Sequence, residues 1–486
     1  MKFLVVASAA LALCACSGNG GSATFRLEPA SAHVTAAGAA VTFTVIVTAG
    51  KAGAVAWNLD GLGRMQVASD MMSAIYTPPD AVEAATTATI SAEMAGRELS
   101  ARITIDPMPA ITGRVVGLDG APFANAVVMA DSGSPTTTDA SGSFAIAGVK
   151  APYAIAATDL ASKYAVVYLG LRRTDPTLVL GIPAGSTLSA VVAGTVRSDL
   201  GSPRVTRVTF DAPGCTGFTD ARADGGYELG FQWPGPAPSV SGVLHALEWT
   251  ADGAGRPVTY SGAASLAHEA PPDHAYGRDL TLTGIGMDTL SGATSEPVGL
   301  HLDVVYANGG RIPLLSPLTW DPSGSSFSYK TPRIDGTLEI IGLSQYAGGG
   351  ERILHRAGLA SNETGIMLNP AALPWPIEPA IGATVTRSTV FSWYAFGVPK
   401  PMYMIAFRST SAGGAAVDVI TSSQQLALDA ASSLGLAPPA GTYTWEVKAT
   451  TAVTSPDEAA GPAGFYAKTN DYQTAHTGPR TLTYVP

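Results

Sequence analysis

Two histidines and a glutamate lie close together in the middle of the chain, where they could bind a metal ion. His268 and Glu269 are followed by His274, and imidazole and carboxylate groups are common zinc ligands. However, Pro271 and Pro272 separate the histidines, and proline breaks the helix that would place both on one face. The remaining histidines are spread along the chain, at positions 33, 245, 301, 355 and 476. We therefore expect no metal site and no cofactor.

Motifs of known catalytic classes are absent from the sequence. It lacks the Gly-x-Ser-x-Gly turn of many hydrolases, the phosphate-binding Gly-x-x-x-x-Gly-Lys-Ser/Thr loop and the His-Glu-x-x-His pattern. We expect no catalytic residues and a protein that is not an enzyme. One alternative stays open, because a glycosidase carboxylate pair needs no sequence proximity: a hydrolase with its catalytic site in residues 191–370.

The apolar segment at the N-terminus is followed by a cysteine that could carry a lipid. Lys2 precedes an apolar run that begins at Phe3 and is too short to cross a bilayer as a helix. The run closes on Leu13-Cys14-Ala15-Cys16. This segment resembles the lipobox of bacterial lipoproteins, whose invariant cysteine accepts diacylglycerol. The resemblance implies a signal peptide over residues 1–15 and a lipid, palmitate included, on Cys16.

By the same resemblance, Ser17 after the cysteine favours sorting to the bacterial outer membrane. We expect a lipid-anchored protein there, with residues 16–24 as a flexible tether and the membrane as one partner. Two alternatives remain. Lipidation of Cys14 would place Leu13, which is not small, at the cleavage position. An ordinary secretory signal cut at Ala15 would release a soluble protein.

Composition narrows the fold class further. Only 14% of residues are charged, while Gly (54) and Pro (35) are abundant, which favours strands and turns over surface helices. The formal net charge of −10 argues against nucleic acid as a partner. Cys215 is the single cysteine beyond the N-terminal segment. The body therefore has no internal disulfide, and we expect Cys215 to be buried rather than reactive.

The first part of the chain shows the alternating pattern of half-buried strands. Val41–Val47 alternates over its first half and Leu99–Ile105 throughout. Trp57 lies in a further strand, and Tyr76-Thr77-Pro78-Pro79 predicts a corner that ends a strand. Together these features resemble a bacterial immunoglobulin-like domain, with Trp57 expected in the core.

The second part carries the clearest signature. Ile111–Val116 is followed by Asp119-Gly120, and later by Thr138-Asp139-Ala-Ser-Gly142-Ser-Phe144. We expect Asp139 to cap a tight turn, Gly142 to adopt a positive φ and Phe144 to point inward, rather than a calcium loop. The pattern resembles the carboxypeptidase-regulatory-like, transthyretin-like sandwich, which implies a structural or protein-contact role. Thr219–Tyr227 repeats it loosely in the third part.

Of the last two parts of the chain, only the C-terminal one resembles a known family. Residues 284–370 contain strands such as Leu300–Tyr306 but resemble no family that we can name. Near the C-terminus, Thr389–Trp393 and Gly441–Ala449 resemble strands of a bacterial fibronectin-type-III-like domain. Trp393 and Tyr443 are expected in its core.

These observations predict an all-β chain, a tandem array of β-sandwiches behind a lipoprotein signal peptide. The expected domains are residues 25–106, 107–184, 185–283, 284–370 and 371–486. The function that fits is a non-enzymatic, membrane-anchored surface scaffold for adhesion or protein binding, with sandwiches in a row and an unknown protein or glycan partner near the far, fibronectin-like end. A carbohydrate-binding protein is an alternative, with sugar stacking on exposed aromatic side chains, namely Trp233, Trp249, Trp320, Tyr329 and Tyr346.

Overall fold

The computed structural model describes residues 24–486 with short gaps, at 37, 51–52, 80–81, 83, 109, 132–133, 183–186, 199–203, 213–214, 235–238, 254, 274, 297, 308–309, 315–325, 347–348, 430–433, 435–438 and 470. The chain divides into two compact units, residues 1–111 with 146–150, and residues 112–145 with 151–486. Within the described residues, no helix has the length and apolar character that crossing a membrane requires. The prediction of an all-β array of sandwiches is confirmed.

The first unit holds sandwich 1, which is built from two four-stranded sheets ordered β1-β3-β6-β5 and β2-β8-β7-β4. Its strands are β1 (Thr24–Glu28), β2 (Ser31–Thr35), β3 (Val41–Ala49), β4 (Ala56–Asp60), β5 (Arg64–Val67), β6 (Ser73–Thr77), β7 (Thr86–Met94) and β8 (Arg97–Asp106). The alternation predicted for β8 is confirmed, because Ala101, Ile103 and Ile105 are buried and the residues between them face outward.

Tyr76 and Trp57 hold the core of sandwich 1 in different ways. Tyr76 is fully buried, and its hydroxyl donates to the Leu62 carbonyl oxygen at 2.7 Å. Trp57 packs against the core but stays half-buried, and its Nε1 donates to the Met71 carbonyl oxygen at 2.9 Å. The indole therefore lies at the margin of the core rather than at its centre.

Sandwich 2 begins the second unit and confirms the turn predicted around Asp139. The Asp139 carboxylate accepts from the backbone N–H of Ser141 at 2.8 Å and of Ser143 at 2.9 Å. Gly142 has a φ of +74° and Phe144 is buried. The strands are β9 (Ile111–Val116), β10 (Val127–Ala130), β11 (Thr136–Thr137), β12 (Ser143–Ile146), β13 (Tyr153–Asp159), β14 (Tyr164–Leu171) and β15 (Thr177–Val179).

Sandwich 3 repeats the turn with Asp224, whose carboxylate accepts from the Gly226 N–H at 2.9 Å while Tyr227 is buried. One sheet joins β16 to β19, β22 and β23, and the other is ordered β18-β17-β20-β21. The strands are β16 (Thr187–Arg197), β17 (Val205–Ala212), β18 (Cys215–Asp220), β19 (Gly226–Pro234), β20 (Val240–Ala251), β21 (Pro257–Ala270), β22 (Ala275–Gly277) and β23 (Leu280–Thr281).

Sandwich 4 pairs the small sheet β27-β24-β30 with strands ordered β26-β25-β28-β29. Leu302 and Val304 alternate along β25 and point into its core, and Ile340 of β28 lies opposite Leu302 in the same core. The strands are β24 (Met287–Thr294), β25 (Gly299–Tyr306), β26 (Arg311–Pro313), β27 (Ser326–Pro332), β28 (Gly336–Gln345), β29 (Glu351–Leu359) and β30 (Ile366–Leu368).

Sandwich 5 confirms Trp393 and Tyr443 as core residues, because both are buried in one apolar cluster. Its small sheet is ordered β31-β33-β36. The elements are β31 (Pro376–Glu378), β32 (Ala383–Val385), β33 (Val390–Trp393), β34 (Met402–Ser409), β35 (Ala416–Thr421), β36 (Gln425–Ala427), β37 (Gly441–Thr450), the single helical turns α2 (Pro456–Ala459) and η1 (Gly464–Tyr466), β38 (Asp471–His476) and β39 (Arg480–Tyr484).

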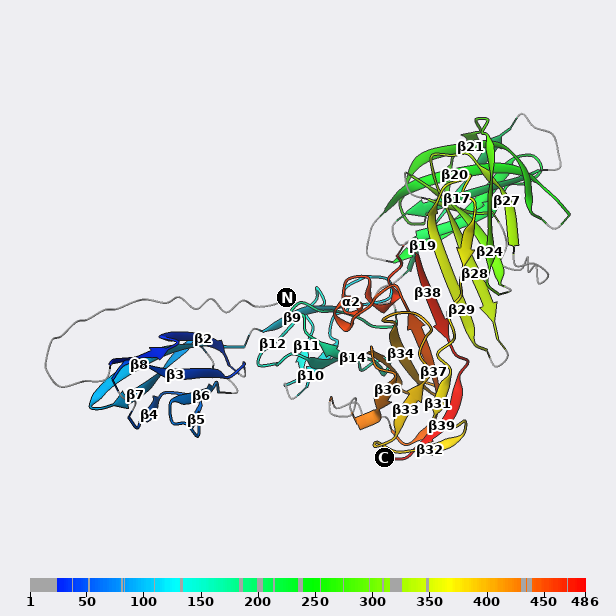
Figure 1. The fold of residues 1–486 in the computed structure, drawn as a ribbon. Coiled ribbons are helices and arrows are strands. Elements are labelled where there is room, and N and C mark those ends of the chain that lie inside the picture. The colour runs from blue at the N-terminus through cyan, green and yellow to red at the C-terminus, as the bar shows by residue number, and fades with distance from the viewer. Residues whose placement is uncertain are drawn as a thin grey trace. The chain divides into compact units, whose positions relative to one another are not determined.

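The larger sheets of sandwiches 2, 5 and 4 are one continuous sheet of 14 strands. β14 of sandwich 2 pairs in parallel with β35 of sandwich 5, and β38 of sandwich 5 pairs with β29 of sandwich 4. In Figure 1, β38 (red) runs beside β29 (yellow). The expectation of a simple row that ends at the fibronectin-like part is therefore wrong, because strand pairing places sandwich 5 between sandwiches 2 and 4.

Sandwiches 3 and 4 are joined by side chains rather than by a common sheet. Leu247, Trp249 and Tyr260 of sandwich 3 belong to the same apolar cluster as the core of sandwich 4. The Tyr260 hydroxyl donates to the Lys330 carbonyl oxygen at 3.0 Å, and Arg207 Nη1 donates to the Pro313 carbonyl oxygen at 2.5 Å. We call this contact the apolar seam.

Candidate functional site

The structure tests several of the residues that the sequence brought forward. Cys16 and the preceding lipobox lie outside the described residues, so lipidation remains a prediction. Cys215 is buried, as predicted. Burial, with a smaller contribution from Asp211, raises the pKa of its thiol to about 11. The thiolate that nucleophilic or redox chemistry requires is therefore scarce at neutral pH.

The histidine and glutamate near position 268 serve packing and hydrogen bonding. His268 is buried, and its Nδ1 accepts from Arg278 Nε at 3.2 Å. Burial, reinforced by Arg278, lowers the pKa of this imidazole. Glu269, the next residue on β21, accepts from Ser239 Oγ at 2.9 Å, and His274 lies outside the described residues. In the described ranges, no three His, Cys, Asp or Glu side chains are grouped so that they could hold a metal ion.

The aromatic residues proposed for sugar stacking do not form an exposed face. Trp233 and Trp249 are both only 2% exposed, so the sugar-stacking alternative does not hold for them. Trp233 fills the core of sandwich 3, and Trp249 packs into the core of sandwich 4. Tyr329 and Tyr346 are half-buried, and the Tyr346 ring packs perpendicular to that of Trp375 at 6.0 Å. Trp320 lies outside the described residues.

Residues 191–370 contain a pair of neighbouring carboxylates, which bears on the hydrolase alternative. Asp303 of β25 and Glu339 of β28 lie directly opposite each other. Arg311 contacts both, at 3.2 Å and 2.5 Å, and Glu339 also contacts His355 Nδ1 at 2.7 Å. Both carboxylates are almost fully buried in these ion pairs. General acid or base catalysis needs a carboxyl group that reaches the substrate, and neither carboxylate meets that requirement here.

Among the described residues of this segment, a serine lies next to a histidine. Ser265 Oγ and His245 Nδ1 lie 2.7 Å apart across β20 and β21. His245 is fully buried and stacks on Tyr306 of sandwich 4, with the ring centroids 4.0 Å apart. The imidazole therefore helps to join sandwiches 3 and 4, and Ser265 satisfies its hydrogen bond from the margin of the contact.

A buried polar cluster holds sandwich 2 to sandwich 5, and we call it the polar seam. Asp418 of β35 is 1% exposed. It accepts a short hydrogen bond from the Tyr164 hydroxyl of β14 and contacts Arg408 Nη1 at 2.6 Å. The Arg408 guanidinium also lies over the Tyr164 ring, 5.3 Å from its centroid. A charge buried this deeply needs such partners, because desolvation otherwise outweighs any Coulombic gain.

Helix α2 adds a second attachment between sandwiches 2 and 5. Ser455 caps the helix by accepting from the Glu458 N–H. The Asp457 carboxylate accepts from the backbone N–H of Arg172 at 2.7 Å and of Arg173 at 3.0 Å. The Arg173 side chain in turn donates to the Asp457 carbonyl oxygen at 2.8 Å. These bonds fix the segment that follows β14 against sandwich 5.

Sequence reasoning missed the seams, although one signal of the polar seam was present. Five consecutive residues of β14 from Tyr164 are buried, as are six in β34 from Met402. A strand that is buried on both faces has a continuous apolar sequence instead of an alternating one. The partner of each strand could not be inferred, because β14 and β35 lie about half the chain apart.

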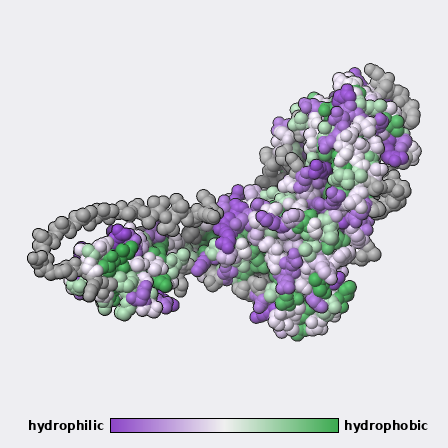
Figure 2. Space-filling model, in the orientation of Figure 1, coloured by the Kyte–Doolittle hydropathy of each residue, from purple (hydrophilic) through white to green (hydrophobic). Residues whose placement is uncertain are grey.

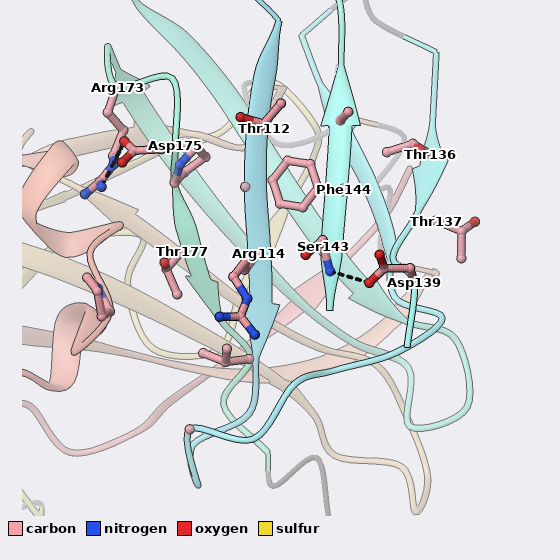
Figure 3. Close-up of a pocket in the computed structure, with 16 residues that line it drawn as sticks. Thr112, Arg114, Thr136, Thr137, Asp139, Ser143, Phe144, Arg173, Asp175 and Thr177 are labelled. Carbon is pink, nitrogen blue, oxygen red and sulfur yellow. Dashed lines mark hydrogen bonds and ion pairs between the residues drawn. The ribbon is translucent and has the colours of Figure 1, made fainter. Parts of the chain in front are cut away.

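Sandwich 2 also carries an open hollow of about 890 Å³. Figure 3 shows Thr112 and Arg114 along β9, Phe144 between β9 and β12, and Arg173 with Asp175 at one end. The hollow is bordered by polar and apolar side chains from several strands, among them Thr136, Thr137, Asp139, Ser143 and Thr177. A concave surface with a few convergent polar groups is where ligands bind most often.

Exposed apolar side chains gather on sandwich 5. Ile377 and Val390 lie on strands of its small sheet, and Tyr394 follows β33 directly. Ile381 and Val485 lie near β32 and β39, which pair with each other. Figure 2 shows apolar (green) residues at the surface of this sandwich. Exposed patches of this kind often mark contact surfaces.

No protein-family model and no curated protein matches the sequence. Among solved structures, the chain is similar to the Bacillus anthracis TIE protein at 10% identity, covering 73% of this chain and 75% of that protein, with a TM-score of 0.20. It is similar to the shaft pilin SpaA from Lactobacillus rhamnosus GG at 8% identity, covering 39% of this chain and 99% of the pilin, with a TM-score of 0.13. It is also similar to BcpA, the major pilin subunit of Bacillus cereus, at 10% identity, covering 54% of this chain and 98% of BcpA, with a TM-score of 0.12. Similarity this low transfers no property of these proteins to this chain.

Proposed function

We propose that this protein is a non-enzymatic scaffold on the bacterial surface, anchored in the outer membrane through a lipid on Cys16. In this proposal sandwiches 2 to 5 act mechanically as one body that presents binding surfaces to a protein or glycan partner. The single observation that supports it most is the continuous sheet through sandwiches 2, 5 and 4. A sheet shared by three sandwiches resists bending and separate unfolding, which is what a scaffold requires.

Calorimetry of the full chain tests the mechanical part of this proposal. We expect sandwiches 2 to 5 to unfold in one cooperative transition, separate from that of sandwich 1, because breaking one of them removes strand partners or core from another. Separate transitions for sandwiches 2, 4 and 5 would contradict a single scaffold.

Membrane fractionation tests the anchor. Cys16→Ala removes the acceptor sulfur, so the protein should move from the membrane pellet to the soluble fraction and lose incorporation of labelled palmitate. Two or three acyl chains bind membranes almost irreversibly, so the difference should be nearly complete. Cys14→Ala is the matched control and should stay membrane-bound. A Cys16→Ala protein that still sediments with membranes would overturn the anchoring proposal.

A further inference from the structure

The hollow on sandwich 2 includes several threonine hydroxyls that have no hydrogen-bond partner among the described residues. The side-chain hydroxyls of Thr112, Thr136, Thr137 and Thr177 make no hydrogen bond to any residue that the structure describes. Each hydroxyl can both donate and accept. Thr137 points away from the hollow in Figure 3, because it follows Thr136 directly on β11. The hydroxyls of Thr112, Thr136 and Thr177 remain around the concave surface and match a ligand that is itself rich in hydroxyls.

Arg114 adds a positive charge to the same surface. Its Nη2 donates to the Ser141 carbonyl oxygen at 3.1 Å, and it has no carboxylate within ion-pair distance in the described part of the chain. The two carboxylates of the lining are already engaged, Asp139 with Ser141 and Ser143, and Asp175 with Arg173 at 3.0 Å. The hydrogen bonds from Ser141 and Ser143 lower the pKa of Asp139, and Arg114, which is near enough to interact with it electrostatically, lowers it further. The Asp139 and Arg114 side chains form no ion pair, so the planar fork of the guanidinium stays open to a ligand carboxylate.

The remaining lining supplies a packed floor and a fixed border. The Phe144 ring lies between β9 and β12 (Figure 3) and is buried, so it supports the strands that carry the polar groups. Thr177 and Arg173 are held in place by sandwich 5, because the Thr177 N–H donates to the Ala460 carbonyl oxygen at 2.7 Å and Asp457 binds the Arg173 backbone. The polar groups are thus presented by a fixed backbone, which lowers the entropic cost of binding.

From these features we propose that the hollow binds a carboxylated oligosaccharide, with the sugar carboxylate on Arg114 and sugar hydroxyls on the surrounding threonines. The volume of about 890 Å³ lies within the ~300–1,000 Å³ of pockets that hold small ligands. An acidic peptide would also pair with Arg114 but would leave most of the threonine hydroxyls without partners. The proposal is independent of the lipid anchor and of the shared sheet.

Calorimetric titration of the full chain with trigalacturonate, maltotriose and triglutamate tests this proposal. We expect trigalacturonate to bind most tightly, and binding to weaken as salt is added. Arg114→Ala should weaken it about 10- to 100-fold, as expected for loss of a charge-assisted hydrogen bond. Thr136→Val and Thr177→Val should each weaken it about 2- to 10-fold. Arg114→Lys should restore part of the affinity.

Arg64→Ala is the matched control, because Arg64 is also an exposed arginine on a strand but lies in sandwich 1. The Arg64→Ala variant should bind trigalacturonate with the same affinity as the wild type. Unfolding temperatures of all variants are measured in parallel, so that a loss of binding is not confused with a loss of fold. The proposal is overturned if trigalacturonate does not bind, if Arg114→Ala binds it unchanged, or if maltotriose or triglutamate binds as tightly.

Discussion

The polar seam and the apolar seam join neighbouring sandwiches by different physical means. Trp249 and Tyr260 bury large aromatic surfaces in the core of sandwich 4, which stabilises by removing apolar area from water. Asp418, Tyr164 and Arg408 instead form directional bonds beside a parallel strand pair. Apolar burial tolerates small shifts between partners, whereas a buried carboxylate is satisfied in one register only. We therefore expect the apolar seam to supply stability and the polar seam to supply specificity.

The largest effect should follow from damage to the apolar seam. Trp249→Ala should lower the free energy of unfolding by about 3–5 kcal/mol, because it leaves a cavity between two cores. Denaturant titration of the full chain measures this change. Phe218→Ala is the matched control, since Arg207 packs over both rings but Phe218 is 56% exposed. It should change stability by less than about 0.5 kcal/mol. Equal effects of the two variants would remove the basis for an apolar seam.

A smaller effect should follow from damage to the polar seam. Asp418→Ala leaves the Tyr164 hydroxyl and the Arg408 guanidinium without their partner. The full cost of a broken buried pair is about 3–5 kcal/mol. Arg408 is 37% exposed and regains water, so we expect about 2–3 kcal/mol. Calorimetry should also show sandwich 2 unfolding apart from sandwich 5. A variant that keeps one shared transition would argue against a specificity role for this cluster.

The smallest effect should be an alkaline response of the polar seam. Burial, and then the neighbouring Asp418, raises the pKa of Tyr164 above its ordinary value of 10.0. The stability that the neutral phenol contributes is fully present below pH 10 and is lost as the pH rises toward the folded-state value. At pH 11 the loss should be about 1 kcal/mol. Tyr164→Phe should flatten the fall of unfolding free energy between pH 10 and 11, as measured by denaturant titration. A slope unchanged from that of the wild type would contradict this assignment.

Local patterns in the sequence predicted much of each sandwich. The Asp139 turn and the alternation in β8 followed from interactions between residues close in the chain. The burial of Trp393 and Tyr443 followed from their positions in strands of a two-sheet core. The candidate binding site could not be predicted in the same way. Thr112, Arg114 and Thr177 are polar residues on ordinary strands, and only the fold shows that they border one hollow.

The sequence by itself therefore determined the class of the protein: strands, turns, buried aromatic residues and an N-terminus that resembles a lipoprotein signal. These properties depend on side-chain periodicity and on neighbours within a few residues. Only the tertiary structure decided which strands meet across the chain, such as β14 with β35 and β38 with β29. The reason is that strand edges present the same backbone donors and acceptors whatever their sequence. The choice of partner depends on long-range packing and on a few buried groups such as Asp418.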